Sequence, residues 1–244
     1  MEQIYLTILI PAYNEEKRLP ESIRLIDAYC KKHLDQPYEL LVVDDGSSDQ
    51  TSALIREMKK QIPSLVLHQY AENRGKGYAL RAGMHLAGGQ FIVFTDSDLS
   101  TPIEEIQPML EKLQEGASIV IATRKKSGAT LVQRQPLWRE SMGKVFTWLS
   151  NVILGLNFSD FTCGFKGFEA MAGKQIFSLQ KIRRWAFDSE VLFLAKQFGY
   201  KIVEIPVQWK DSPESKVHVI QDSASSLASL FLIRWNWFTG KYKR

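Results

Sequence analysis

The first half of the sequence alternates between two apolar patterns, and this alternation constrains the fold more than any other feature. Nearly continuous apolar runs of strand length occupy 4–12, 38–47, 64–70, 90–96 and 117–124. Segments with apolar residues at helical spacing lie between them, at 15–33, 47–61, 75–88 and about 103–115. Apolar strands that alternate with helices are typical of a mainly parallel sheet covered on both faces. The sequence therefore predicts an α/β fold.

Polar clusters follow the first four of these strands. "PAYNEE" follows the first, "DDGSSD" the second, "ENRGKG" the third and "DSD" the fourth. Ligands of open α/β sheets bind at the carboxyl ends of the strands, where such clusters would meet. We therefore interpret the clusters as parts of one site, in preference to four independent solvated loops.

Two acids, Asp96 and Asp98, end the apolar run "FIVFT". Carboxylates at the end of a buried strand must be balanced by a metal cation or a basic side chain, or be exposed to water. Their oxygens suit Mg²⁺ or Mn²⁺, which keep coordination positions free for substrate phosphates. The structural alternative is a helix N-cap, because Thr101 and Pro102 begin a helix nearby. The position of the pair at the ligand-binding edge favours the metal.

Asp44 and Asp45 end the second strand and allow two interpretations. In the first, the two acids belong to a turn at Gly46 that precedes a helix capped by Ser47 or Ser48. In the other, they accept hydrogen bonds from a base or a ribose.

The segment "NRGKG" offers flexible backbone and a cation, Lys76, in front of a helix N-terminus. That arrangement suits a phosphate group. The glycines match neither the P-loop pattern nor the dinucleotide fingerprint, which disfavours a dehydrogenase.

The bulk properties exclude several classes of protein. A net charge of +4 is too small a bias to indicate nucleic-acid binding, although it is compatible with anionic small molecules or an anionic membrane surface. Cys30 and Cys163 show neither zinc-ligand spacing nor a disulfide framework. No signal-peptide pattern and no apolar run near the ~18–20 residues of a spanning helix occurs. We expect a cytoplasmic protein that is soluble or peripheral on the cytoplasmic face of a membrane.

The second half is less regular. A basic loop at 124–136 precedes an apolar helix at 138–156, and a strand at 201–209 precedes the C-terminal segment. Aromatic residues mixed with Lys and Arg suit a membrane interface; core packing or a dimer contact is the alternative for the helix. These aromatic residues are Trp138, Trp148, Trp235, Trp237 and Phe238.

Several blocks, in this order and spacing, resemble the family 2 glycosyltransferases with a GT-A (Rossmann-like) fold. They are "ILIPAYNEE", "ELLVVDDGSSDQT", "NRGKGYALRAG" and "FTDSDLS". "DFTCGFKGF", "RRWAFDSEVLFLA" and "VEIPVQWKDSPESKV" resemble dolichyl-phosphate sugar synthases. "CGFK" with "RWAFD" is closer to dolichyl-phosphate β-glucosyltransferases than to the mannosyl enzymes. The resemblance covers nearly all of 5–217 and implies a GT-A domain at 1–217 with an amphipathic C-terminal tail at 218–244.

The resemblance implies a nucleotide-sugar donor site. Asp96, Ser97 and Asp98 would hold the diphosphate through Mg²⁺ or Mn²⁺, Asp98 most directly. The remaining donor residues would be Pro11, Tyr13 and Glu15 in the nucleotide pocket, Val42 and Asp44 near the base, and Lys210 and Lys216 on a loop that closes over the diphosphate.

The acceptor implied by the resemblance is a polyprenyl or dolichyl monophosphate. Arg124 and Arg139 match arginines that meet the phosphates, and Arg134 of the same basic loop is a further candidate for the acceptor phosphate; a solvated surface is the alternative for this loop. Asp188, in "WAFDSE", would contact a sugar hydroxyl or orient a basic group, unless it only caps a helix. We therefore expect Asp98, Arg124, Arg139 and Asp188 to carry the reaction.

The chemistry of this reaction follows from the acceptor. A phosphate monoester is mostly dianionic at neutral pH, so it is a nucleophile without a strong general base. Arginines would offset the repulsion between the two anionic substrates, and the metal would stabilise the leaving diphosphate. A single displacement inverts the anomeric carbon, so an α-linked donor gives a β-linked product.

We expect the donor to be UDP-glucose, and two departures from the mannosyl pattern weaken the case for a mannosyl donor. Ser100 stands where mannosyl members often carry Gln, and Lys210 where they usually carry Arg. A GDP-mannose-dependent enzyme is the alternative within the class. A catalytically silent nucleotide-sugar-binding partner protein is the alternative from another class. A membrane surface is an expected partner, and a membrane protein or a second copy of the chain is a further candidate.

Overall fold

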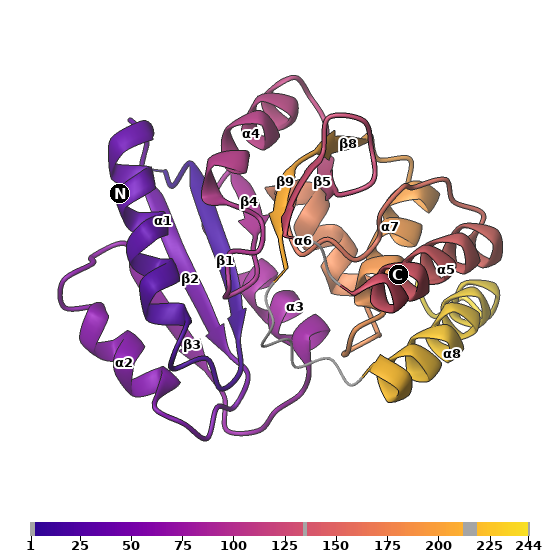
Figure 1. Ribbon diagram of the computed structural model, residues 1–244, viewed down its shortest axis with the longest axis horizontal. Coiled ribbons are helices and arrows are strands. Elements are labelled where there is room, and N and C mark those ends of the chain that lie inside the picture. The colour runs from indigo at the N-terminus through magenta and orange to yellow at the C-terminus, as the bar shows by residue number, and fades with distance from the viewer. Residues whose placement is uncertain (1–2, 134–135, 212–218, 244) are drawn as a thin grey trace.

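A mixed β-sheet with helices on both faces forms the body of the protein (Figure 1). The computed structural model describes residues 3–133, 136–211 and 219–243. Seven of the described strands form the sheet in the order β3-β2-β1-β4-β7-β5-β8, and only β7 runs antiparallel to its neighbours. The strands are β1 Leu6–Ala12, β2 Tyr38–Asp44, β3 Leu65–Gln69, β4 Phe91–Phe94, β5 Ile119–Thr123, β7 Lys166–Glu169 and β8 Ile202–Pro206. The predicted mainly parallel α/β sheet is confirmed.

Two apolar clusters lie on opposite faces of this sheet, because successive strand side chains point to alternate faces. Ile8 and Ile10 belong to one cluster with α1, α2 and α4, whereas Leu9 belongs to the other with α3, α6, α7 and α8. The helices are α1 Leu19–His33, α2 Thr51–Met58, α3 Lys76–Leu86, α4 Ile106–Gln114 after a short 3₁₀ turn at Ile103–Glu105, α5 Leu137–Leu154, α6 Ala170–Leu179, α7 Phe187–Gln197 and α8 Val219–Phe238.

Strand β7 was not predicted from the sequence. It has four residues, Lys166–Glu169, and includes a lysine and a glycine, so it lacks the apolar run that marks the parallel strands. The predicted strand 201–209 is divided in two: β8 ends at Pro206, and β9 (Gln208–Lys210) pairs with β6 (Thr130–Gln133) in a separate two-stranded sheet.

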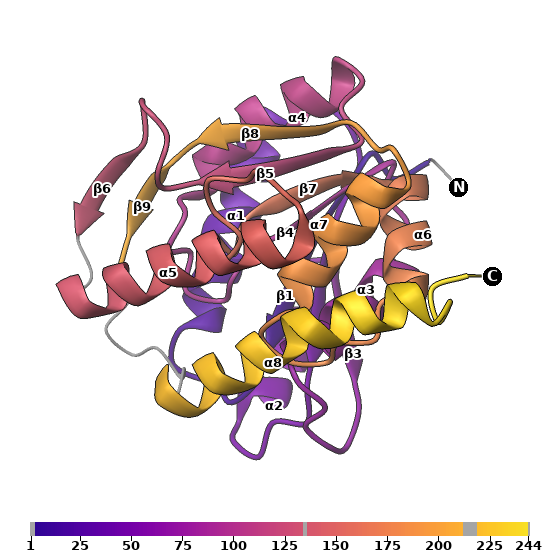
Figure 2. The same ribbon diagram turned by 90° about the vertical axis from the view of Figure 1, so that its right-hand side faces the viewer.

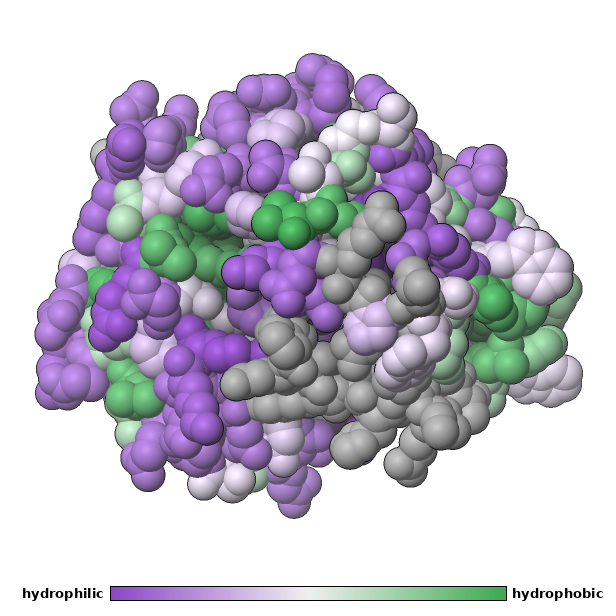
Figure 3. All heavy atoms as spheres, in the orientation of Figure 1, coloured by the Kyte–Doolittle hydropathy of each residue, from purple (hydrophilic) through white to green (hydrophobic). Residues whose placement is uncertain are grey.

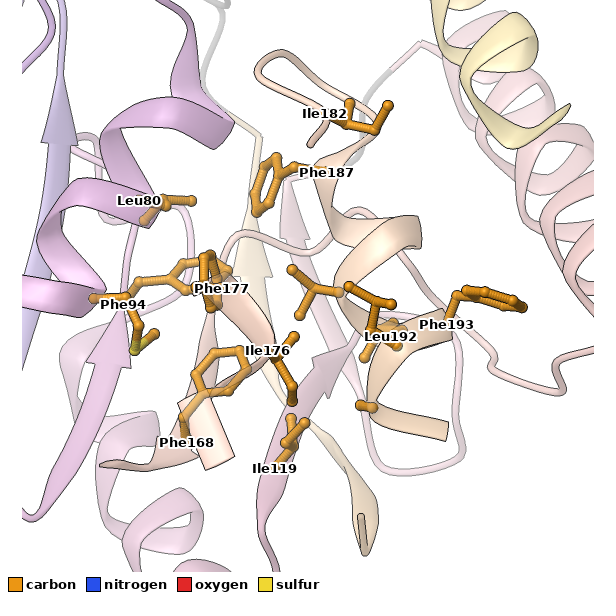
Figure 4. Close-up of a cluster of buried hydrophobic side chains, with 14 of the residues drawn as sticks. Leu80, Phe94, Ile119, Phe168, Ile176, Phe177, Ile182, Phe187, Leu192 and Phe193 are labelled. Atoms are coloured by element: carbon orange, nitrogen blue, oxygen red, sulfur yellow. The ribbon is translucent and has the colours of Figure 1, made fainter. Parts of the chain in front are cut away.

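Aromatic side chains connect β4 to the elements that follow it in the sheet (Figure 4). The ring of Phe94, at the end of β4, lies 6.0 Å from the ring of Phe168 in β7 and 6.2 Å from that of Phe187 at the start of α7. Phe177 of α6 meets Phe168 edge to face at 5.6 Å. This packing fixes the end of β4, where Asp96 and Asp98 follow, against β7 and α7.

Helices α5 and α8 lie side by side at one end of the molecule (Figure 2). Leu230 and Ile233 of α8 and Tyr242 beyond it are buried in the same cluster as Leu9, whereas the opposite side of the helix is exposed. The C-terminal segment is thus amphipathic, and its inner side is part of the core.

The exposed apolar side chains of these two helices form what we call the outer apolar face. They recur at helical spacing, and apolar atoms gather over this region at the right-hand edge of the molecule in Figure 3. The face consists of Trp138, Met142, Val145, Trp148 and Val152 of α5 and Phe231, Leu232, Trp235 and Phe238 of α8. Among the described helices, none is long and apolar enough to cross a bilayer.

We expect the two sides of α8 to respond differently to truncation. Leu230→Ala or Ile233→Ala should each lower the free energy of unfolding by about 2–5 kcal/mol, because each removes a fully buried side chain. Phe231→Ala and Leu232→Ala, on the exposed side, should change it by no more than ~0.5 kcal/mol. Urea unfolding of the four variants measures this difference. Equal effects on the two sides would contradict the packing of α8.

Candidate active site

The loops after β1 and β2 are joined by hydrogen bonds at the carboxyl edge of the sheet. The Asn14 amide donates to Ser47 Oγ at 2.8 Å, and the Ser48 amide donates to Asn14 Oδ1 at 2.8 Å. The Glu15 amide donates to Thr51 Oγ1 at 2.8 Å. The structure thus brings together the first two polar clusters, as predicted.

Asp45 attaches the third cluster to the second. Its carboxylate accepts hydrogen bonds from the amides of Arg74 and Gly75, both at 2.8 Å, and from the Asn73 side chain at 2.9 Å. Burial raises the pKa of Asp45, and the two amide hydrogen bonds act in the opposite direction. Asp45 therefore holds the "NRGKG" loop at the end of β2, a role that the sequence analysis did not assign.

Asp44 and Val42, which we expect near a base, are both fully buried, and their contact with a base stays a prediction. Asp44 is fully buried and accepts hydrogen bonds from the amide and hydroxyl of Ser47, at 3.0 and 2.5 Å, and from the hydroxyl of Ser52. These contacts form the predicted turn, but the predicted cap at Ser47 or Ser48 is wrong, because the N-cap residue of α2 is Gln50. Val42 is fully buried in the apolar cluster beneath α1 and α2, so its side chain packs in the core and offers no exposed surface.

Asp96 is enclosed by a lysine and a glycine. Its Oδ1 accepts a hydrogen bond from Lys76 Nζ, which also lies 5.7 Å from the centre of the Trp185 ring. A Cβ at Gly164 would lie 1.9 Å from Asp96 Oδ2, so only glycine leaves room for this carboxylate. Burial acts to lower the pKa of Lys76, but Asp96 and Asp188 outweigh it and raise the pKa. Lys76 is therefore charged beside Asp96.

Asp98 lies in a tight turn that begins at Asp96. The Ser100 amide donates to Asp98 Oδ1 at 3.0 Å, and Leu99 between them has a φ of +48°, which is uncommon for a residue with a branched side chain. Arg18 approaches Asp98 Oδ2 at 3.8 Å and makes two hydrogen bonds, both of 2.8 Å, to Glu15. Arg18 is a cation of the site that the sequence analysis missed.

The carboxylates of Asp96 and Asp98 fit a divalent cation that is shared with a substrate. Their side chains are 36% and 18% exposed, so both are open to the loop edge. Residues 3–133, 136–211 and 219–243 contain no group of three or more His, Cys, Asp or Glu able to hold an ion alone. Mg²⁺ is commonly bound by one or two carboxylates together with substrate phosphates. The site therefore suits a cation whose remaining ligands come from a diphosphate.

Lys166 and Asp188 form a buried ion pair behind this edge. Lys166 is fully buried, and its ammonium donates to Asp188 Oδ1 at 2.6 Å and to the carbonyls of Phe161 and Cys163 at 3.0 and 2.6 Å. Burial raises the pKa of Asp188, while Lys166 and Lys76 oppose that rise. The N-cap residue of α7 is Ala186, so Asp188 lies in the first turn and is not the cap. The ion pair with Lys166 is compatible with the orientation of a basic group, and contact of Asp188 with a sugar hydroxyl stays a prediction.

Arg124 is held at the end of β5. Its guanidinium makes hydrogen bonds of 2.7 and 2.9 Å to Asp160 and one of 2.8 Å to Thr162 Oγ1, and it lies 5.1 Å from the centre of the Trp209 ring. Although burial acts to raise the pKa of Asp160, Arg124 holds it below its usual value. Arg124 therefore has a fixed orientation before any substrate binds.

The remaining predicted residues are placed as follows. Tyr13 is 40% exposed, Glu15 is buried beside Arg18, and Pro11 lies in β1.

Two backbone carbonyls of the turn that holds Asp98 accept hydrogen bonds from other elements. The Ser22 hydroxyl donates to the Ser97 carbonyl at 2.7 Å, and the Lys210 amide donates to the Ser100 carbonyl at 2.8 Å, so β9 borders this turn. Arg134 and Lys216 lie outside the described residues, and Arg139 is in the first turn of α5 with its side chain outside the description.

The sequence matches a known family over most of its length. The family described as "Glycosyl transferase family 2" matches residues 7–177. A dolichyl-phosphate beta-glucosyltransferase of Dictyostelium discoideum is 31% identical, over 100% of this chain and 78% of the relative. The Homo sapiens protein of the same name is 31% identical, over 98% of this chain and 77% of the human chain. The resemblance inferred from the sequence is confirmed.

Solved structures confirm the GT-A type of fold. Glucosyl-3-phosphoglycerate synthase from Mycobacterium tuberculosis, in complex with Mn²⁺, uridine diphosphate and glucosyl-3-phosphoglycerate, aligns with a TM-score of 0.71 at 18% identity. The alignment covers 95% of this chain and 80% of that one. The same enzyme with Mn²⁺, UDP-glucose and glycerol 3-phosphate also gives a TM-score of 0.71, at 17% identity, with the same coverage of the two chains.

We expect Gly164→Ala to displace the Asp96 carboxylate, because the three nearest atoms to the new methyl group all belong to that carboxylate. Calorimetric titration with UDP and Mn²⁺ should then show affinity reduced by roughly tenfold or more, which corresponds to about one lost charge-assisted hydrogen bond. Gly88→Ala is the control, because its new methyl group would meet only Ile4, at 3.1 Å, and the Glu39 side chain, at 3.6 Å. Unchanged UDP affinity in a folded Gly164→Ala variant would contradict the role of Gly164.

Proposed function

The chain belongs to glycosyl transferase family 2, and we propose that it transfers glucose from UDP-glucose to a polyprenyl or dolichyl monophosphate. The observation that carries the proposal is the pairing of Asp96 with Lys76 and of Asp98 with Arg18 at the carboxyl edge of the sheet. Two carboxylates and two cations in that position suit a nucleotide diphosphate and its metal ion. Two relatives at 31% identity are named dolichyl-phosphate beta-glucosyltransferases, which supports the choice of sugar and acceptor.

On the donor side, Asp96 and Asp98 would hold Mg²⁺ or Mn²⁺ against the diphosphate. The bound ion would stabilise the negative charge of the diphosphate as it leaves. Lys76 and Arg18 would meet the diphosphate oxygens once their carboxylate partners turn to the ion. Tyr13 and Glu15, on the loop after β1, would border the nucleotide.

On the acceptor side, a phosphate monoester attacks the anomeric carbon of the sugar. It is mostly dianionic at neutral pH, so no side chain has to remove a proton. Asp188, buried and bound to Lys166, is accordingly assigned to positioning. The phosphate oxygen forms the new bond to carbon as the bond to the diphosphate breaks, which inverts the anomeric configuration. Arg124 would stabilise the approaching phosphate.

The outer apolar face would rest on the cytoplasmic surface of the membrane that holds the lipid acceptor. Tryptophan and aliphatic side chains beside basic residues suit the interfacial region of a bilayer. Arg234 of α8, next to Trp235 in the sequence, supplies positive charge that favours anionic lipids, whereas the charge of Lys144 on α5 is balanced by Glu140. A membrane protein or a second copy of the chain is the competing occupant of this face.

Calorimetry with two donors separates the proposal from its rivals. We expect binding of UDP-glucose that requires Mn²⁺ and weaker or no binding of GDP-mannose. Asp98→Asn should reduce glucosyl transfer to a short polyprenyl phosphate by at least about a hundredfold, in the range seen when a charge-stabilising group is removed, with little change in thermal stability. Tighter binding of GDP-mannose would favour the mannosyl alternative. Donor binding without transfer by the wild type would favour a silent binding protein.

Vesicle flotation tests the membrane surface. Trp148→Glu and Trp235→Glu should each reduce binding to vesicles that contain anionic lipid, because a charge replaces an interfacial tryptophan. Met171→Glu is the matched control, since Met171 is a 78% exposed apolar residue that lies on α6 and is not part of the outer apolar face. Failure of the wild type to float, together with dimers that the tryptophan variants disrupt, would assign the face to a second copy.

A further inference from the structure

A small pocket opens between the end of β5, strand β6 and the first half of α5. Its volume is about 50 Å³, several times the roughly 10–15 Å³ that one water molecule requires, so it can admit a group of phosphate size. Residues of both signs border it, with cations in the majority. The lining residues are Arg124, Lys125, Leu131, Glu140, Gly143, Lys144 and Trp209.

Lys125 directs its ammonium group across this pocket to α5. Nζ donates to Thr147 Oγ1 at 2.7 Å and to the carbonyl of Gly143 at 3.4 Å, both neutral oxygens. An ammonium group has three donors, so one is left for a ligand. Burial lowers the pKa of Lys125; the charge of Asp160 opposes this shift, and the neighbouring cations Arg124 and Lys144 add to it. An anion in the pocket would therefore stabilise the charged form of Lys125.

The acids around the pocket are already committed to other cations. Asp160 forms its hydrogen bonds with Arg124, and Glu140 pairs with Lys144 at 2.7 Å. Lys125 has no salt bridge to any acid in the described parts of the chain. The pocket thus carries a surplus of positive charge, and a phosphate monoester is the kind of anion that would balance it.

Arg124 places this pocket next to the donor site. Arg124 lines the pocket, and its guanidinium also binds Asp160 and Thr162. Asp160 and Thr162 lie just before Gly164 in the sequence, and the Asp96 carboxylate packs against Gly164. A phosphate held beside Lys125 would be separated from the donor diphosphate by the Arg124 side chain, which could contact both.

Helix α5 also connects the pocket to the outer apolar face. Glu140, Gly143 and Lys144 line the pocket, and Met142 and Val145, next to them in the sequence, belong to that face. An isoprenoid chain attached to a phosphate in the pocket could therefore reach the membrane along α5 without passing through the core.

We propose that Lys125 binds the phosphate of the lipid acceptor in this pocket, with Lys144 at its rim. The proposal rests on the proposed function and adds to it a residue that neither the sequence analysis nor the comparisons assign. The ligand chemistry is a phosphate monoester that carries an isoprenyl chain, and free phosphate shares only the charged part of it.

Steady-state kinetics of Lys125→Met provide the test. We expect the KM for a short isoprenyl phosphate to rise roughly 10- to 100-fold, as for the loss of a hydrogen bond to a charged group, while the KM for UDP-glucose stays within about twofold. Lys125→Arg should restore most of the acceptor affinity. Lys126→Met is the control, because Lys126 pairs with Glu204 at 2.7 Å and does not line the pocket. An unchanged acceptor KM in Lys125→Met would overturn the proposal.

Calorimetric titration without donor separates this proposal from the proposed function. The wild type should bind the isoprenyl phosphate, bind inorganic phosphate more weakly, and not bind the corresponding alcohol with comparable affinity; Lys125→Met should lose the phosphate-dependent part. If the wild type binds the isoprenyl phosphate through Lys125 but transfers no glucose, the pocket stands and the proposed function fails. If it transfers glucose and Lys125→Met binds the isoprenyl phosphate normally, the pocket assignment fails. Equal thermal melting of the variants excludes unfolding as the cause.

Discussion

A lysine that is fully buried in an inner strand of a sheet must be paired, and the arrangement of the candidate active site depends on how Lys166 is paired. The cost of removing an ammonium group from water is several kcal/mol unless a counter-charge and hydrogen bonds replace the solvent. Asp188 supplies the charge, and the carbonyls of Phe161 and Cys163 accept the other two hydrogen bonds. The backbone before β7 is thereby folded over the ammonium group. Gly164 lies in that segment and forms the surface on which Asp96 rests.

The cations of the proposed donor site are also paired with carboxylates, but at more exposed positions. Lys76 pairs with Asp96, and Arg18 lies between Glu15 and Asp98. Each of these pairs joins a cation that suits a phosphate to a carboxylate that suits a metal ion. On binding of a diphosphate and a divalent cation, the carboxylates would move to the metal ion and the basic side chains to the diphosphate. Every charge would then still be paired, so the cost of removing the site from water would stay small. Lys125 differs because its hydrogen-bond partners are neutral, and for this reason we assign it to a ligand that arrives without a metal ion.

The parts of the site that the sequence predicted are those determined by local pattern. Apolar runs located the parallel strands, and the polar clusters after them located the ligand edge, because parallel strands align their carboxyl ends. Strand β7 was missed because its pairing is antiparallel and its four residues include a buried charge. Asp44 and Asp45 look equivalent in the sequence, but adjacent residues at a strand end point in opposite directions. Which of the two reaches the third loop is decided by tertiary packing, and it is Asp45.

The proposed acceptor site was harder to predict than the proposed donor site. The donor residues follow parallel strands of one sheet, whereas the acceptor pocket combines the end of β5, β6 and α5, which are consecutive in the sequence, with Trp209 of the distant strand β9. The basic loop was recognised by its charge, yet charge alone does not distinguish Arg124, held by a buried carboxylate, from Lys125, which is not. An arginine fixed by Asp160 keeps one geometry and suits the reacting phosphate. Lys125 is bound only to neutral oxygens, so its ammonium group can exchange them for an anion. This property suits a residue that binds the phosphate as it arrives from the membrane side. The division of these two tasks between neighbouring residues follows from what each side chain is paired with in the folded chain.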